Sequence, residues 1–568
     1  MDYLVLVETY ERLEEVSSKL KKTDILAELF SKTPTGDLEK VVLLVTGRVF
    51  PIYSQNELGI ATQMMLRAIS KASGFRAEEI EQKFKKTGDL GLTAEECIKS
   101  KKQATLFKKR LEIDFVFDNL QKLAFVTGAG SQDRKLNLIA ELLASSKPKE
   151  ARYIVRTILE ELRVGAAEGL IRDAIVQAFL LNPHMRKEEK EELTAVVDYA
   201  WNILSDFGEI AKIAKQKGLS GLKKVRVELG KPIQVMLAEK AENMKDVFDE
   251  FKKLAVEWKY DGMRAQIHKK GNQIWVYTRR LEDVTKQFPD LVDLCKQGLK
   301  SKECIVEGEV LGISSKTKLP LPFQVLSQRI HRKYEIEEMI KQIPIQINLF
   351  DVIYVEGKMC VASPLTERRK LLEKVVKSIP GKFQLAEQFI TDDLKKAEKF
   401  YKVALDAKQE GVMLKVLDSN YIFGRHVGGW YKIKPIMETL DLVIIGATWG
   451  EGKRVKWLSS YVLGCRDPNT GEFLECGMMS TGLTEEEYEN MTNVLKPLIE
   501  FEKGRDVKIK PKVVIEVGYQ EIQKSPNYKS GFALRFPRLV RIRQDRSTDD
   551  ADTIERLESL FKTQGRAG

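Results

Sequence analysis

The sequence predicts a multidomain protein that joins an all-helical domain, an α+β domain and a small all-β domain. The chain has 568 residues, which is long for one domain and indicates about three at ~150–200 residues each. Residues 1–228 show the apolar periodicity of helices, whereas strand-like runs begin after that point. Beyond Pro435 the pattern changes again, to short strands with tight turns.

Residues 1–228 are predicted to form a helical domain. In the segment "ARYIVRTILEELRVG" the apolar residues recur at helical spacing, and Gly165 is expected to end that helix. The loops of this domain are expected at residues 87–91 and 127–135, which are rich in glycine and polar residues.

Residues 229–434 are predicted to form an α+β domain. Residues 265–277 contain two strand-like runs joined by Lys-Lys-Gly-Asn, which is typical of a β-hairpin. Further strand-like runs, with helical stretches between them, follow in "CIVEGEVLGI", "IQINLFDVIYV", "GVMLKVL" and "WYKIKP".

Residues 435–568 are predicted to form a compact β domain such as an OB-fold, followed by a C-terminal helix. The segment "DPNTGE" at residues 467–472 is expected to form a turn between two strands. Asp552 and Glu555 have the spacing of a capping box at the start of the last helix.

Composition limits the classes of function. Apolar residues make up 43% and charged residues 31%, and no apolar run approaches the ~20 residues of a membrane span. The net charge of +11 fits a polyanionic partner, although charge alone does not separate this from simple solubility. The six cysteines form no C-x-x-C pair, so neither a zinc site nor a disulfide framework is indicated, and a reducing intracellular location fits. With only four histidines, the chemistry is expected to depend on Lys, Arg, Asp and Glu.

The segment "EWKYDGMR" offers Lys259 as a possible nucleophile, with Arg264 close in sequence. A lysine amine becomes nucleophilic when a desolvated pocket or a cationic neighbour lowers its pKa. K-x-D-G alone also fits a turn at the end of a surface strand, so the segments that follow decide between the two interpretations.

Those later segments supply the other groups that nucleotide transfer requires. "VEGEVLG" places Glu307 and Glu309 on one strand face, and "NLFDVIY" supplies Phe350. "EGVMLK" supplies Glu410, and "GGWYKIKP" places Lys432 and Lys434 at a spacing of two. A lysine, several cations, carboxylates and an aromatic ring suit nucleotidyl transfer, in which positioning and charge neutralisation dominate. No G-x-x-x-x-G-K-[ST] motif is present, so the chain is not a P-loop enzyme.

This ordered set of motifs resembles that of the ATP-dependent DNA ligases of the archaeal and eukaryotic replicative type, along essentially the full chain. The short N-terminus resembles the archaeal members. The resemblance implies a helical DNA-binding domain, an adenylation domain and an OB-fold domain. It also implies three steps: formation of a lysyl-AMP on the enzyme, transfer of AMP to the 5′-phosphate at a nick, and sealing by the 3′-hydroxyl.

The resemblance further implies a role for each matching residue. Lys259 matches the nucleophile, and Glu410 and Asp261 match the positions expected to hold Mg²⁺ or Mn²⁺. Glu309 is favoured over Glu307 by the register of its motif. The other positions that match ATP or AMP contacts are Glu257, Arg264, Arg279, Glu309, Phe350, Arg425, Lys432, Lys434, Asp545 and Arg546. The chain departs from the family pattern at His426, where relatives often have a basic residue, and at Arg546, which is often lysine.

Each of these residues also has a purely structural interpretation. Phe350 lies in an apolar run, where an aromatic ring is usually part of the core. Lys432 and Lys434 could form an exposed strand face, and Glu410 could cap a helix or form an ion pair. Only the order of the motifs favours function at each position.

Other functions also fit parts of this sequence. An RNA ligase or an mRNA capping enzyme would use the same lysine chemistry, although the large helical domain favours duplex DNA as substrate. An NAD-dependent ligase would be expected to carry a cysteine zinc cluster. A non-catalytic DNA-binding protein with a decayed adenylation domain would be expected to have lost at least one of the charged residues.

The expected partner is nicked double-stranded DNA, bound by a monomer that is cytoplasmic and associated with the nucleoid, with no membrane contact. A second partner is suggested by "KKQATLFKKR", where similar ligases present a glutamine and aromatic residues to the sliding clamp. Gln103 and Phe107 match this pattern, but Leu106 replaces the second aromatic residue. Phe107 could instead fix this basic loop to the helices beneath it.

Overall fold

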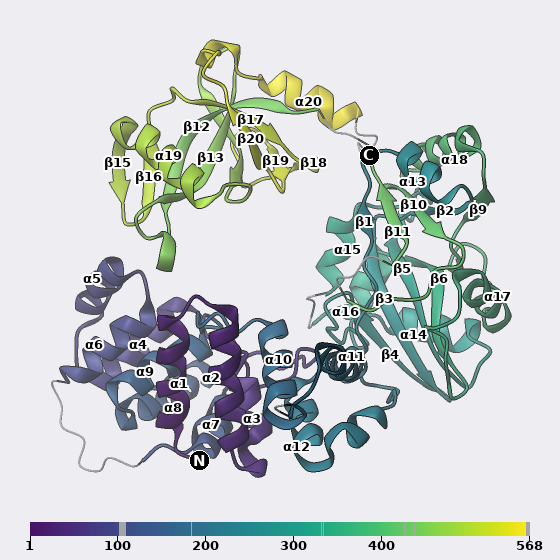
Figure 1. Cartoon of the computed structure of the whole chain (residues 1–568). Helices are drawn as coiled ribbons and strands as arrows, with labels where there is room; N and C mark the ends of the chain where they lie inside the picture. The colour runs from purple at the N-terminus through teal and green to yellow at the C-terminus, as the bar shows by residue number, and fades with distance from the viewer. Residues whose placement is uncertain are drawn as a thin grey trace. The chain divides into compact units, whose positions relative to one another are not determined.

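The structure is a computed structural model that describes residues 1–101, 110–182, 184–330, 332, 334–424, 428–435 and 438–563. The chain divides into two compact units, and Figure 1 labels its helices and strands. The first unit comprises residues 1–77 and 94–434, and the second comprises residues 78–93 and 435–568. Among the described residues, no helix is both long and apolar enough to span a membrane.

The N-terminal part of the chain is helical. Its helices are α1 (Tyr3–Glu15), α2 (Lys19–Lys32), α3 (Thr35–Val45), α4 (Thr62–Ser73), α5 (Ala77–Thr87), α6 (Leu90–Lys99), α7 (Ile113–Phe125), α8 (Ser131–Ser145), α9 (Pro148–Ile158), α10 (Glu168–Phe179), α11 (Lys187–Leu204) and α12 (Phe207–Lys223). Helix α9 ends well before Gly165, so the predicted end of this helix was wrong. Glu160 and Arg163 both adopt positive φ angles, and Glu161 N donates to Arg156 O, which turns the chain away earlier.

The central part of the chain contains two sheets, each with helices on one face. Its helices are α13 (Met244–Phe251), α14 (Pro289–Gly298), α15 (Phe323–Ile330), α16 (Ile336–Gln342), α17 (Leu365–Val375) and α18 (Leu394–Asp406). Its strands are β1 (Glu239–Lys240), β2 (Leu254–Lys259), β3 (Met263–Lys270), β4 (Gln273–Thr278), β5 (Glu303–Gly312), β6 (Ile345–Val355), β7 (Lys358–Met359), β8 (Phe383–Leu385), β9 (Gln388–Thr391), β10 (Gly411–Val416) and β11 (Trp430–Ile433).

The first sheet has the strand order β1-β11-β10-β2-β9, and the second has β4-β3-β5-β6-β7 with β8 beside β6. Residues of α13 and α18 pack on the first sheet, for example Val247 and Ala397. Residues of α14 and α17, such as Leu291 and Leu372, pack on the second sheet. The predicted hairpin is β3–β4, with Lys270 paired to Gln273 across the turn.

The C-terminal part of the chain contains a seven-stranded sheet, a two-stranded sheet formed by β18 and β19, and two helices. Its strands are β12 (Leu440–Trp449), β13 (Leu458–Arg466), β14 (Phe473–Met479), β15 (Ile499–Lys503), β16 (Asp506–Ile509), β17 (Val514–Gly518), β18 (Glu521–Lys524), β19 (Phe532–Arg535) and β20 (Arg538–Ile542). The helices are α19 (Glu485–Leu495) and α20 (Ile554–Thr563), with short 3₁₀ helices at Gly452–Arg454, Lys496–Leu498 and Thr548–Asp550.

Strand β12 holds this sheet together, because it pairs with β13 on one side and with both β16 and β17 on the other. Residues 467–472 connect β13 to β14, as predicted. The predicted capping box of α20 was wrong. Asp552 accepts a hydrogen bond from Asp441 N, and the amide of Arg556 donates instead to Thr553 Oγ1.

Candidate active site

The register of the first sheet brings the predicted residues of β2 and β11 onto one face, with β10 lying between these strands. Lys259 pairs with Gly411, and Glu257 pairs with Met413, which in turn pairs with Lys432. Since side chains of paired residues lie on the same side of a sheet and alternate along a strand, Glu257, Lys259 and Lys432 share one face. Segments that are far apart in the sequence therefore meet around Lys259.

Glu410 lies between two lysines at the end of this face. It forms ion pairs with Lys259 and with Lys434, and its amide donates to Lys259 O at 2.9 Å. Burial alone would raise the pKa of Glu410, but the charges of Lys259 and Lys434 outweigh it and lower the pKa to about 2. Burial also lowers the pKa of Lys434. Glu410 is therefore ionised at neutral pH, beside two lysines.

The second sheet contributes Arg264 and two glutamates. Arg264 Nη2 lies 2.7 Å from Glu307 Oε2, and Nη1 donates to Met236 O at 2.6 Å. Its guanidinium carbon lies 5.4 Å from the centre of the Phe350 ring. The motif register favours Glu309 over Glu307, yet Glu307 is the glutamate that binds Arg264 directly.

Glu309 has a different environment from Glu307. Burial raises its pKa to about 7, opposed by Lys259 and Arg264 and reinforced by Glu410 and Asp261. Asp261 Oδ2 accepts from Phe323 N at 3.3 Å. The carboxylates of Glu309, Asp261 and Glu410 are thus close enough to affect one another.

A buried ion pair lies farther along the face of the first sheet. Lys415 Nζ is 2.6 Å from Glu257 Oε2, and both side chains are 2% exposed. Gln388 Nε2 donates to the other oxygen of Glu257 at 2.7 Å. The Lys415 ammonium also lies 4.1 Å from the centre of the Trp430 ring and 4.8 Å from that of Phe350. Phe350 is partly exposed, as the predicted stacking role requires.

Two further predicted cations lie near this cluster. Lys432 Nζ donates to Ala238 O at 3.3 Å, and burial lowers its pKa, with contributions from Lys434, Lys259 and Arg279. Arg279 itself is exposed and directly follows β4.

Of the remaining predicted residues, three lie outside the described part of the chain and two belong to the second unit. Arg425, Gln103 and Phe107 lie outside the described residues. Asp545 and Arg546 belong to the second unit. There Asp545 is bound by Arg543 at 2.8–2.9 Å, which lowers its pKa, and Arg546 Nε lies 3.3 Å from Asp441.

Sequence reasoning missed several residues around the site. Lys415 and Trp430 stood inside quoted motifs, so period-two alternation along their strands could have placed them on the face of Glu257. Gln388 and Tyr421 lie outside the motifs, and no local pattern marks them. Their contacts with Glu257 and Glu307 join residues that are more than a hundred positions apart.

Three parts of the chain match known protein families. Residues 2–176 match the family described as DNA ligase N terminus. Residues 235–434 match the ATP dependent DNA ligase domain, and residues 454–546 match the ATP dependent DNA ligase C terminal region.

Relatives are similar over the full chain. A DNA ligase of Nanoarchaeum equitans is 46% identical, covering 99% of each chain. A DNA ligase of Thermococcus onnurineus is also 46% identical, over 100% of this chain and 99% of the relative. A DNA ligase of Archaeoglobus fulgidus is 43% identical over 99% of each.

Solved structures show the same fold at low sequence identity. The structure described as Pmar-Lig_Pre has a TM-score of 0.59 at 17% identity, covering 95% of this chain and 99% of that one. The predicted combination of helical, adenylation and OB-fold domains is confirmed. Because relatives that are more than 40% identical cover nearly the whole chain, this chain belongs to the ATP-dependent DNA ligases.

Proposed function

We propose that the face of the first sheet around Lys259 is the nucleotide-transfer site of this ligase, with Lys259 as the nucleophile. The observation that supports this best is the cluster in which Glu410 lies between Lys259 and Lys434, with Lys432 nearby. Two lysines paired with one carboxylate, and a third lysine nearby, favour a polyphosphate substrate, because developing phosphate charge needs fixed positive groups.

The proposed first step joins the Lys259 amine to the α-phosphorus of ATP. The ammonium loses a proton, an N–P bond forms, and the bond to the β-phosphate oxygen breaks to release pyrophosphate. The 5′-phosphate at a nick then displaces Lys259 from AMP. Finally, the 3′-hydroxyl attacks that phosphate and AMP leaves.

The other residues are proposed to hold the nucleotide. The carboxylate of Glu257 would accept a hydrogen bond from the edge of the adenine ring, while Lys415 and Gln388 hold that carboxylate in place. Phe350 would stack on the base, and Glu309 and Arg264 would contact the sugar and phosphates. Arg279, Lys432, Lys434 and, outside the described residues, Arg425 would neutralise phosphate charge.

We propose Mg²⁺, or Mn²⁺, as the metal that accompanies ATP. The described residues contain no group of three or more metal-binding side chains. The oxygen donors Glu410 and Asp261 nevertheless suit a hard cation, and Mg²⁺ is commonly held by one or two carboxylates together with substrate phosphates. Since Glu410 is bound to two lysines, its metal role requires their displacement by the phosphates. The metal would supply charge neutralisation at the α-phosphate.

Labelling with radioactive ATP tests the nucleophile. Lys259→Ala should abolish the protein–AMP adduct, and Lys259→Arg should do the same because a guanidinium stays protonated. Lys270→Ala is the matched control, since Lys270 also ends a strand but is exposed. Formation of the adduct by either Lys259 variant would show that another residue attacks ATP.

We propose that Asp545 and Arg546 serve the first step only. Replacing both with Ala should slow adduct formation and largely spare the sealing of a nick that is already adenylated. Equal losses in the two assays would contradict this role.

We also propose that the enzyme works as a monomer and that it acts at the nucleoid in the cytoplasm. The boundaries between its three domains are proposed to lie near residues 228 and 434. Gln103 and Phe107 are proposed as a weak docking segment for the sliding clamp. Phe107→Ala should then lose clamp binding in a pull-down while unassisted nick sealing is kept.

A further inference from the structure

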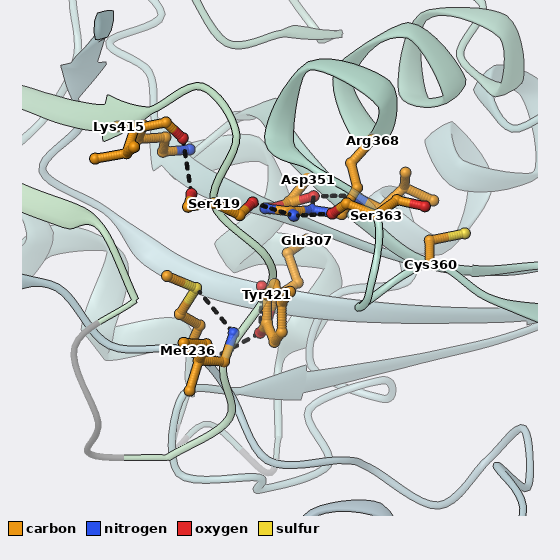
Figure 2. Close-up of polar contacts among 12 residues, drawn as sticks. Met236, Glu307, Asp351, Cys360, Ser363, Arg368, Lys415, Ser419 and Tyr421 are labelled. Carbon is orange, nitrogen blue, oxygen red and sulfur yellow. Dashed lines mark hydrogen bonds and ion pairs between the residues drawn. The ribbon is translucent and has the colours of Figure 1, made fainter. Parts of the chain in front are cut away.

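Tyr421 lies in the connection between β10 and β11, beside the candidate active site (Figure 2). It is 3% exposed, and its ring contacts those of Phe423 and Trp430 edge-on. Its position in the sequence indicates no role in nucleotide transfer. Its role is therefore inferred from its contacts in the folded chain.

The hydroxyl of Tyr421 uses both its donor and its acceptor capacity. It donates to Glu307 Oε2 at 2.9 Å and accepts from Met236 N at 2.8 Å. Burial, reinforced by the charge of Glu307, raises the pKa of Tyr421 well above its ordinary value. The phenol therefore stays protonated and remains a donor to the carboxylate.

The same two partners hold the guanidinium of Arg264. Arg264 Nη1 donates to Met236 O at 2.6 Å, and Nη2 donates to Glu307 Oε2 at 2.7 Å. Arg264 Nη2 also lies 3.4 Å from Tyr421 Oη, at the long end of the hydrogen-bond range. Tyr421 thus fixes both anchors of the arginine and contacts it only weakly.

A buried ion pair keeps the Tyr421 segment in place. Arg368 binds Asp351 through two hydrogen bonds of 2.8 and 3.0 Å, and neither side chain is exposed. Arg368 Nη1 also donates to Ser419 O at 2.9 Å and to Ser363 O at 2.7 Å, as Figure 2 shows. The backbone two residues before Tyr421 is therefore tied to β6 and to the start of α17 (Leu365–Val375).

We propose that Tyr421 is a positioning residue for nucleotide transfer, whose hydroxyl holds Arg264 in the orientation that bound ATP requires. This inference rests on the proposed contact between Arg264 and the nucleotide. A phenol suits the task because it can join a backbone amide and a carboxylate at one point without adding charge.

Tyr421→Phe is the direct test, because it removes one oxygen and keeps the packed ring. Loss of a hydrogen bond to a charged group predicts that kcat/KM for adduct formation falls by about tenfold, mainly through a higher KM for ATP. Tyr277→Phe is the matched control, since the hydroxyl of that buried residue also bonds a backbone group, Gly230 O, and among the described residues it forms no hydrogen bond with Arg264. An equal loss in both variants, or wild-type kinetics in Tyr421→Phe, would overturn the inference.

A double-mutant cycle with Arg264→Lys shows whether Tyr421 acts through the arginine. If it does, Tyr421→Phe should have little further effect in the Arg264→Lys enzyme, whereas full additivity would overturn the inference. If Arg264→Lys alone leaves adduct formation unchanged, the proposed contact between Arg264 and the nucleotide is contradicted, and the inference about Tyr421 fails with it. Should Tyr421→Phe not fold, as judged by thermal unfolding, Glu307→Gln takes its place in the cycle with the same criteria.

Discussion

Glu309 and Glu410 are carboxylates of one site whose pKa values move in opposite directions. Burial raises the pKa of Glu309 to about 7. Burial acts in the same direction on Glu410, but Lys259 and Lys434 overcome it and bring its pKa to about 2. The difference comes from direct ion pairs, which Glu410 has and which are not seen for Glu309 in the described part of the chain.

These shifts predict opposite effects on stability. A raised carboxylate pKa means that the folded state binds the proton more tightly, so stability falls as pH rises from the ordinary value of 4.5 through about 7. Glu309→Gln should therefore raise the unfolding temperature by a few degrees at pH 8, with little change at pH 4.5. It should also impair adduct formation.

Glu410→Gln provides the opposite case. Its lowered pKa contributes stability that is complete above pH 4.5 and is lost as pH falls toward about 2. The variant should unfold at a lower temperature than the wild type at pH 8. Thermal unfolding of both variants across pH checks the pair, and shifts of the same sign at pH 8 would contradict the assignment.

At the residue scale, the sequence predicted the charged groups that converge on Lys259 but not what holds them. Lys259, Glu410 and Lys434 were predicted from the ordered motifs, and the structure brings them into direct contact. Tyr421 was not predicted, because its importance depends on contacts 114 and 185 residues away in sequence. Local pattern carries no information about such pairs.

At the scale of elements, Gly411 shows how closely β10 and β11 approach each other at the site. Gly411 has a φ of +147°, and a Cβ atom there would lie 2.1 Å from Ile433 O. The residue directly follows Glu410 and pairs with Lys259. A side chain at this position would push β11, and Lys432 with it, away from the nucleophile.

Gly411→Ala should therefore cost about 3 kcal/mol or more, from unfavourable φ and overpacking together. It should also reduce adduct formation more than stability alone explains. Gly271→Ala is the control. Gly271 has a φ of +59°, but an added Cβ atom would meet nothing within 4 Å, so this substitution should lower the free energy of unfolding by only about 1 kcal/mol. Chemical denaturation and ATP labelling measure the two effects, and equal losses for the two variants would refute the steric argument.

The strands themselves were largely predictable, whereas their pairing was not. Runs of β-branched and apolar residues marked β5, β6 and β10 because alternation along a strand is a local property. The pairing of β2 with β10 joins segments about 150 residues apart, and only the folded chain reveals it. The end of α9 and the start of α20 were mispredicted for a related reason, because other hydrogen bonds replaced the expected stop and cap. After α9, Arg156 O accepts from Glu161 N, and at α20 Asp552 accepts from Asp441 N while Thr553 Oγ1 accepts from Arg556 N.

At the scale of the whole molecule, the positive charge is unevenly distributed along the helical part. Residues 211–227 contain six basic residues and no acidic one. Lys217, Lys223 and Lys224 are exposed there, and helix α12 is interrupted at Gly218. In the described part of the chain no carboxylate forms an ion pair with these three lysines, so their charge is available to DNA phosphates.

Replacing Lys217, Lys223 and Lys224 with Ala should weaken binding to nicked duplex DNA of any sequence, because phosphate contacts are not base-specific. The dependence of log affinity on log salt should become shallower by about 0.9 for each DNA phosphate that the variant no longer neutralises. Lys32, Lys187 and Lys190, replaced together, give the same change in net charge elsewhere on the helical part, where Lys32 and Lys187 are paired with glutamates. Adduct formation with ATP should be unchanged in both triple variants. Identical salt slopes for the two variants would show that α12 makes no special contribution and that only net charge attracts the DNA.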